Sequence, residues 1–229
     1  MLYAPFDELY FVLVLPAFIF SMWAQFKVSS SFKRYSEQRT LNGLTGAAAA
    51  QEVLRQAGVS GVRIERVQGK LTDHFDPRSN VIRLSDSVHD MPSVAAVGVA
   101  AHEAGHAIQY ANAYAPMRLR AAIIPVTNFG SKMSIPLVLL GIFFDMTGLI
   151  NIGILLFGAV VLFQLVTLPV EFNASRRAIT ILENSGLLNR AEIPASKKVL
   201  TAAALTYVGA LAVSLAQLIR LIAMSQRRR

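Results

Sequence analysis

The chain has 229 residues, of which 54% are hydrophobic and only 16% are charged, and its mean hydropathy is +0.47. These values exceed the usual composition of soluble proteins and predict a membrane protein. The net charge of +8 could indicate nucleic-acid binding, but no Lys/Arg run is interleaved with stacking aromatic residues, so we expect no nucleic-acid partner and instead contact with anionic membrane lipid. Because cysteine is absent, disulfides and thiolate metal ligands are excluded.

Residues 1–26 are predicted to form an N-terminal transmembrane anchor. Residues 9–26 carry no charge, and they approach the roughly 20 residues that a helix needs to cross the hydrocarbon core. Asp7 and Glu8 stand where a cleaved signal peptide would have basic residues. The positive-inside rule then places the N-terminus outside and the following segment in the cytoplasm, because the span is followed by Lys27, Lys33, Arg34 and Arg39.

The region 27–116 reads as a small segment outside the membrane. Its first predicted helix runs from about residue 44 to residue 57, with Thr45 as a possible cap and Gly58 ending it. Residues 62–67 alternate apolar and charged side chains as a half-buried strand does, and residues 81–84 form a second short strand. We expect a β-hairpin or small sheet, which either packs on the next helix or binds an extended peptide at its edge.

Residues 102–106 read His-Glu-Ala-Gly-His inside the Ala-rich, Pro-free stretch 94–108, which predicts a helix capped by Asp90 or Ser93. Two histidines four apart on a helix share one face, so His102 and His106 can bind the same zinc ion. Glu103 can then act as general base toward a water on that zinc. This spacing is the H-E-x-x-H signature of zinc peptidases.

The third zinc ligand is expected in the second half of the chain. Residues 117–170 predict a transmembrane helical hairpin that turns near residues 145–151, and Pro169 is expected to end it. Glu171 would begin the next helix, within a cytoplasmic segment 171–198, on the same side of the membrane as His102 because a hairpin crosses twice. The alternative is that Glu171 is a first-turn carboxylate that only favours the helix dipole.

Residues 199–229 combine an apolar segment, 199–223, with the basic tail Arg227-Arg228-Arg229. If this segment spans the membrane, the basic tail lies outside the cell, which contradicts the positive-inside rule. The alternative is that the segment does not cross the membrane completely. Both possibilities stay open, and the sequence therefore predicts three to four transmembrane helices in a mainly α protein.

Two motifs in this order resemble the YugP-like bacterial membrane zinc metallopeptidases: Leu-Thr-Asp-His-Phe-Asp-Pro at 71–77 and Ala-Ala-His-Glu-Ala-Gly-His-Ala-Ile-Gln at 100–109. The resemblance covers nearly the whole chain. It implies a zincin fold, with 27–116 as its cytoplasmic half, one zinc ion per chain, and proteolysis at the bacterial inner membrane with the active site facing the cytoplasm.

More distantly, the chain is similar to HtpX-like and CAAX-processing membrane peptidases, which carry a glutamate ligand in a Glu-x-x-x-Asp pattern. Glu171 matches the ligand, but Ser175 stands where that pattern has Asp. Asn173, Ser175 or Glu183 must then orient a zinc-bound imidazole.

Other polar residues have two interpretations each. His74 either stabilises an oxyanion or is an exposed turn residue, and His89 is expected to be structural. Arg176 and Arg177 either polarise the scissile carbonyl or bind lipid headgroups. Gly105 either lets a substrate strand approach the metal or allows close helix packing.

The expected function is a membrane-integrated zinc endopeptidase that hydrolyses membrane or membrane-associated proteins, with His102, His106 and Glu171 as ligands and Glu103 as general base. One alternative is a non-catalytic zinc-binding membrane scaffold. Another is an intramembrane peptidase of the site-2 type that uses Asp145, a charged residue within an apolar run, as third ligand. Substrate, cleavage specificity and oligomeric state are not determined by the sequence.

Overall fold

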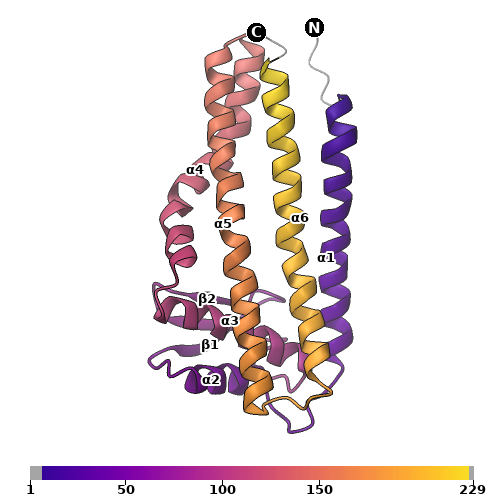
Figure 1. The fold of residues 1–229 in the computed structure, drawn as a ribbon, viewed down its shortest axis with the longest axis vertical. Helices are drawn as coiled ribbons and strands as arrows, with labels where there is room; N and C mark the ends of the chain where they lie inside the picture. The colour runs from indigo at the N-terminus through magenta and orange to yellow at the C-terminus, as the bar shows by residue number, and fades with distance from the viewer. Residues whose placement is uncertain (1–6, 227–229) are drawn as a thin grey trace. The chain divides into compact units, whose positions relative to one another are not determined.

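The computed structural model describes residues 7–226 (Figure 1). The basic tail 227–229, on which one topology argument rests, lies outside the described residues. A mainly α fold with a small sheet is confirmed. In chain order the elements are η1 (Tyr10–Val14), α1 (Leu15–Ser36), α2 (Gly46–Gln56), β1 (Arg63–Val67), β2 (His74–Asp76), β3 (Val81–Ser85), α3 (Val94–Ala111), α4 (Ala115–Phe143), α5 (Thr147–Ser185) and α6 (Ile193–Gln226).

The chain divides into two compact units. The helical unit comprises Met1–Ala24, Leu119–Leu168 and Leu205–Arg229, and the mixed unit comprises Gln25–Arg118 and Pro169–Ala204. All three strands and helices α2 and α3 belong to the mixed unit, as do the lower-numbered part of α6 and the higher-numbered part of α5.

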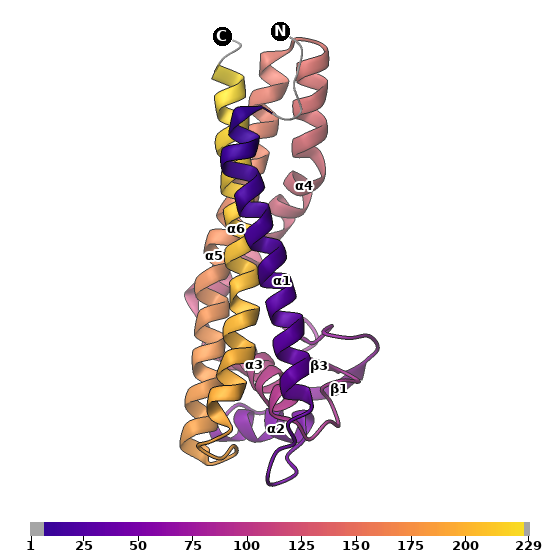
Figure 2. The same cartoon turned by 90° about the vertical axis from the view of Figure 1, so that its right-hand side faces the viewer.

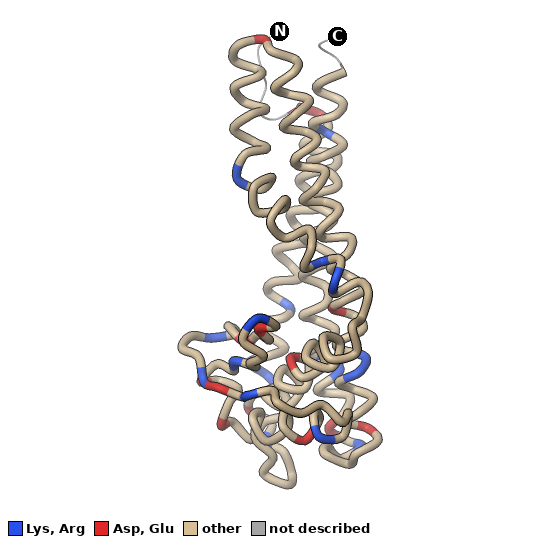
Figure 3. The backbone as a smooth tube through the Cα atoms, turned by 90° about the vertical axis from the view of Figure 1, so that its left-hand side faces the viewer, with Lys and Arg blue, Asp and Glu red and all other residues tan. Residues whose placement is uncertain are grey.

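Within residues 7–226, four helices are long and apolar enough to cross a membrane: Tyr10–Ser36, Ala115–Phe143, Thr147–Ser185 and Ile193–Gln226. Most of their residues within the helical unit are uncharged, as the tan colour of the backbone tube in Figure 3 shows. Arg220 of α6 is an exception and is buried, but its Nε lies 2.9 Å from Asp7 Oδ1 and its guanidinium stacks on the Tyr10 ring. Pairing compensates a charge that would otherwise be costly inside an apolar bundle.

The predicted turn between the second and third apolar helices is correct. Helix α4 ends at Phe143 and α5 begins at Thr147, with Asp145 between them in the left-handed region at φ +53°. Its short polar side chain tolerates that backbone conformation better than most residues do. Asp145 therefore lies at a helix connection.

The prediction that Pro169 ends a helix is wrong, because α5 continues without interruption from Thr147 to Ser185. Proline removes one backbone hydrogen bond, but neighbouring helices in a membrane bundle hold such a helix together. Glu171 consequently lies in the interior of α5, and the interpretation of Glu171 as a first-turn carboxylate is wrong as well.

The sheet of the mixed unit has strand order β1-β3-β2, and Figure 2 labels the paired strands β1 and β3. Strand β1 pairs parallel with β3, and β2 pairs antiparallel with β3. The prediction of a direct hairpin between residues 62–67 and 81–84 is therefore wrong, because these two strands are parallel. The chain between them forms β2, which pairs with the opposite edge of β3. The central strand β3 supplies Val81, Ile82 and Leu84 to the core, each fully buried.

Helix α3 lies at the centre of the mixed unit, in contact with α2, β2 and β3. Ser93, one of the two expected caps, accepts a hydrogen bond from the backbone N–H of Ala96. Small side chains cover much of α3, including Ala96, Ala100 and Ala104, and all three are fully buried. Small residues let neighbouring elements approach the helix axis closely, which determines where the two histidines meet the rest of the unit.

Candidate metal centre

His102 and His106 of α3 meet Glu171 of α5 within the mixed unit. The Nε2 atoms of His102 and His106 lie 3.2 Å and 3.5 Å from the same carboxylate oxygen, Glu171 Oε2. One ligand atom from each residue lies within 4.8 Å of the other two. The side chain of Glu171 is only 3% exposed, so its charge has little access to water.

This donor set fits zinc. Zinc prefers nitrogen and oxygen ligands when no thiolate is present, and tetrahedral coordination at about 2.0–2.2 Å places neighbouring ligand atoms about 3.3–3.6 Å apart. The two nitrogen–oxygen distances, 3.2 Å and 3.5 Å, agree with that separation. Three protein ligands also leave a fourth position free, which is the arrangement of catalytic zinc sites.

Glu103 follows His102 directly on α3 and is 8% exposed. Within the described residues 7–226, no hydrogen bond or ion pair engages its carboxylate, in contrast to the carboxylate of Glu171. A carboxylate next to the metal ligands and free of protein partners is available to a water molecule or to substrate. The structure therefore places a candidate base beside the cluster.

Close contact between α3 and α5 brings the ligands together, and Gly105 makes this contact possible. A Cβ atom added at Gly105 would lie 2.5 Å from the backbone oxygen of Ala174, which is far below van der Waals contact. Gly105 lies between the two histidines, and Ala174 lies one turn after Glu171. Of the two interpretations of Gly105, this geometry favours close helix packing.

The Nδ1 atoms of both histidines have hydrogen-bond partners other than Glu171. His102 Nδ1 lies 3.0 Å from Ser175 Oγ, so Ser175 occupies the orienting position that the sequence left to one of three residues. Glu183 is exposed on α5, and Asn173 binds Gln109 and Arg177 instead of His102. Such outer contacts fix the ring orientation of metal-binding histidines.

Sequence reasoning missed Gln109, whose Oε1 lies 3.0 Å from His106 Nδ1. Gln109 is completely buried at the last turn of α3. Its spacing of three residues from His106 puts both on one helix face, which was the available signal. A buried amide at that spacing satisfies the second nitrogen of the imidazole.

Three other candidate residues do not join the cluster. His74 is exposed at the start of β2, and its Nδ1 contacts the backbone oxygen of Thr72 at 2.8 Å. Arg176 is exposed on α5. Among residues 7–226 the group that could hold a metal ion consists of His102, His106 and Glu171, without Asp145. The cluster thus gives no support to a site built on Asp145.

Without a metal, the cluster favours a proton on His106. Burial disfavours the charged imidazole, but the hydrogen bond to Glu171 and the negative charges of Glu103 and Glu171 outweigh it, so the pKa of His106 is raised above its ordinary value. A zinc ion binds the neutral imidazole and would displace this proton.

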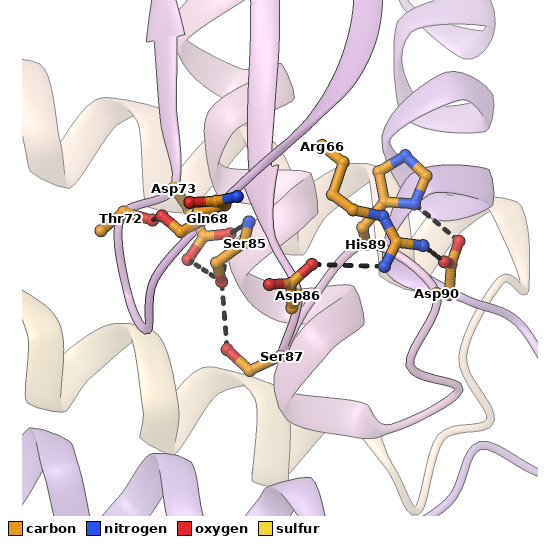
Figure 4. A network of polar contacts seen from close by, with 9 residues as sticks. All are labelled: Arg66, Gln68, Thr72, Asp73, Ser85, Asp86, Ser87, His89 and Asp90. Carbon is orange, nitrogen blue, oxygen red and sulfur yellow. Dashed lines mark hydrogen bonds and ion pairs between the residues drawn. The ribbon is translucent and has the colours of Figure 1, made fainter.

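A network of polar contacts includes Asp73, just before β2, and Ser85 at the end of β3 (Figure 4). Asp73 Oδ1 accepts a hydrogen bond from Ser85 N at 2.7 Å, and both its oxygens contact Ser85 Oγ. Burial raises the pKa of Asp73 despite these hydrogen bonds from Ser85, and the charge of Glu103 adds to the effect. His89, expected to be structural, binds Asp90 in the same network.

We expect Asp73→Asn to raise the thermal midpoint of the protein in detergent at pH 7 by a few degrees or less. A carboxyl group whose folded pKa is raised stabilises the fold below its unfolded pKa of about 3.9 and loses that contribution as the pH rises through the folded pKa. The amide introduced at position 73 carries no charge to be buried. Its NH2 group can donate a hydrogen bond to Ser85 Oγ, and the Ser85 hydroxyl can in turn donate to Ser87 Oγ, 3.0 Å away.

The measurement is the midpoint of each variant between pH 4 and 8, where the gain over wild type should shrink toward acid pH. Asp86→Asn is the control, because the Asp86 side chain is 56% exposed and pairs with Arg66 at the surface. A lower midpoint for Asp73→Asn at pH 7 contradicts the prediction.

Comparison with known proteins defines the class of protein to which this fold and metal centre belong. The chain belongs to the family described as "Putative neutral zinc metallopeptidase", whose profile matches residues 10–226. The expected resemblance is thereby confirmed. The chain is also similar to the "Putative membrane protease YugP" of Bacillus subtilis (strain 168), with 46% identity over 214 residues, which cover 93% of this chain and 95% of the relative. No solved structure matches the chain.

Proposed function

We propose that the protein is a membrane-integrated zinc endopeptidase that hydrolyses peptide bonds of membrane or membrane-associated proteins. The observation that carries the proposal is the buried carboxylate of Glu171 shared by the Nε2 atoms of His102 and His106, with the free carboxylate of Glu103 beside it. In the metal-free protein a protonated His106 offsets the charge of Glu171, which is 3% exposed, and a bound zinc ion would take over that role. The family membership and the membrane protease relative agree with this function.

His102, His106 and Glu171 would hold one zinc ion. Bound zinc supplies Lewis acidity, which polarises the scissile carbonyl and lowers the pKa of a coordinated water to about 7. Glu103 takes one proton from the attacking water and delivers a proton to the amide nitrogen as the carbon–nitrogen bond breaks. Ser175 and Gln109 hold the two imidazoles in place through their Nδ1 atoms.

Strand β2 supports the binding of an extended peptide. It forms one edge of the sheet and contacts α3, and Phe75 of β2 lies 5.8 Å, between ring centroids, from Tyr110 near the end of α3. A peptide that pairs with the free edge of β2 would run alongside the metal helix. His74 at the start of this strand is exposed, so it could contact such a peptide.

Membrane location follows from four helices that are long and apolar enough to span a bilayer. We place the protein in the bacterial inner membrane with the metal centre facing the cytoplasm, because Lys27, Lys33 and Arg34 follow the first apolar segment. Arg176 and Arg177 lie one to two turns beyond Glu171. By the same rule, their positive charges favour the cytoplasmic side of the membrane. Substrates that reach a site beside these segments are embedded in the membrane or attached to it.

Removal and restoration of zinc tests this function. We expect the purified protein in detergent to contain close to one zinc per chain and to cleave a library of quenched fluorescent peptides. A chelator should abolish cleavage, and added zinc should restore it, because three protein ligands hold the ion reversibly. Glu171→Ala should contain little zinc and should not regain activity.

Asp145→Ala is the matched control, because that carboxylate lies in the connection between α4 and α5. Zinc content and cleavage should equal those of wild type. A protein that lacks zinc, or one that cleaves equally well in the presence of chelator, overturns the proposed function. If Asp145→Ala loses its zinc and Glu171→Ala retains it, Asp145 is the third ligand, as in an intramembrane peptidase of the site-2 type.

A further inference from the structure

Gln109 connects the two helices that carry the metal ligands, and it does so through three hydrogen bonds. Its Oε1 lies 3.0 Å from His106 Nδ1. Its Nε2 donates to the backbone oxygen of Val170 at 2.8 Å and to Asn173 Oδ1 at 3.0 Å. The side chain is 0% exposed, so all its hydrogen bonds must come from these protein partners.

The direction of these hydrogen bonds is fixed by groups that can act in only one way. Arg177 Nε lies 2.8 Å from Asn173 Oδ1, and a guanidinium only donates, so the group that Asn173 presents must be its oxygen. The backbone oxygen of Val170 only accepts. The Gln109 group that faces both acceptors must therefore be its NH2, and the group that faces His106 must be its oxygen.

This direction determines the tautomer of His106. An amide oxygen only accepts, so His106 Nδ1 must carry a hydrogen, and the lone pair of the neutral ring lies on Nε2. Nε2 is the nitrogen that lies 3.5 Å from Glu171 Oε2. Protein contacts alone thus prepare His106 as a metal ligand.

His102 differs from His106 in this respect. Its Nδ1 partner is Ser175 Oγ at 3.0 Å, and a hydroxyl can donate or accept. The contact orients the ring but leaves the tautomer open. Of the two histidines, only His106 has its tautomer imposed by the protein.

We propose that Gln109 is a positioning residue that imposes the Nδ1–H tautomer on His106 and so sets the zinc affinity of the site. The inference rests on the proposed function and deepens it. Because Gln109 also binds the backbone of Val170, the residue before Glu171, the same amide sets the position of the third ligand relative to His106.

The test compares Gln109→Met with Gln109→Glu in the full-length protein. Methionine has similar length but no acceptor for His106, so we expect its zinc dissociation constant, from competition with a chromophoric chelator, to rise about 10–100-fold. Glutamate keeps an acceptor for Nδ1–H but loses the NH2 that donates to Val170 and Asn173, so it should recover part of the affinity lost in Gln109→Met. The absorption spectrum of the Co²⁺-loaded protein should change in Gln109→Met and resemble wild type in Gln109→Glu.

Gln51→Met is the control for the substitution itself, because Gln51 is exposed on α2. Its zinc affinity should equal that of wild type. Unchanged zinc affinity in Gln109→Met overturns the inference. Equal losses in Gln109→Met and Gln109→Glu, with equal drops in the melting temperature of the metal-free proteins, also overturn it, since they indicate packing alone.

A second measurement needs no variant. In zinc-loaded wild type with ¹⁵N-labelled histidine, NMR should show a proton on Nδ1 of His106 and metal coordination at Nε2; coordination at Nδ1 overturns the inference. If wild type binds no zinc in either experiment, the proposed function itself fails, and this outcome is distinct from normal zinc binding without any effect of Gln109.

Discussion

Glu103→Gln is expected to retain full zinc content and lose peptide hydrolysis by about 10²–10⁴-fold, the usual contribution of a positioned general base. The amide has nearly the same shape as the carboxylate but cannot take up a proton. Because no hydrogen bond or ion pair engages Glu103 within residues 7–226, the substitution breaks neither. Zinc content, melting temperature and cleavage of fluorescent peptides are measured on the same preparation.

The control for this prediction is Glu183→Gln, which makes the same change at an exposed position of α5. It should leave zinc content and hydrolysis at wild-type values. Undiminished hydrolysis in Glu103→Gln would exclude Glu103 as the base. A zinc-loaded wild type without hydrolysis, whose cellular function survives in Glu103→Gln, would instead support the non-catalytic scaffold.

The features that the sequence predicted well are those set by local patterns. Thr45 and Ser93 begin α2 and α3 because their side-chain oxygens accept from backbone N–H groups three residues on. Uncharged stretches long enough to span a bilayer identified the apolar helices, and the i, i+4 spacing identified His102 and His106 as one pair. Such signals depend on residues within a few turns of each other.

The features that the sequence predicted wrongly depend on contacts between distant segments. Alternation along residues 63–67 predicts a strand, but it does not determine whether β1 pairs with β3 in the parallel or the antiparallel sense. Pro169 normally ends a helix, but α5 continues through it, and neighbouring helices in a membrane bundle, which local sequence does not reveal, can stabilise such a helix. Gln109 stands at the end of the 100–109 motif, three residues after His106, but its role also depends on Val170 and Asn173, more than 60 residues away, which no local pattern reveals.

Gly105→Ala is expected to weaken zinc binding by more than the roughly 10–100-fold that follows loss of an outer hydrogen bond. Alanine is intrinsically the better helix former by about 0.5–1 kcal/mol, so helix propensity alone would favour the variant. The new Cβ, however, would lie 2.5 Å from the backbone oxygen of Ala174. A backbone carbonyl cannot rotate away as a side chain can, so α3 and α5 must separate at the point where they hold the three ligands.

Two other glycine positions provide a graded control, measured by the same zinc competition. Gly98→Ala of α3 would approach Ser196 Oγ, a side-chain atom that can rotate, and should cost little affinity. Gly158→Ala of α5 has nothing within 4 Å and should leave zinc binding unchanged. Wild-type zinc affinity in Gly105→Ala, combined with a higher KM for peptide, would instead mean that Gly105 leaves room for substrate. Because the helix-packing interpretation predicts loss of metal and the substrate interpretation predicts retention of metal, zinc affinity alone distinguishes them.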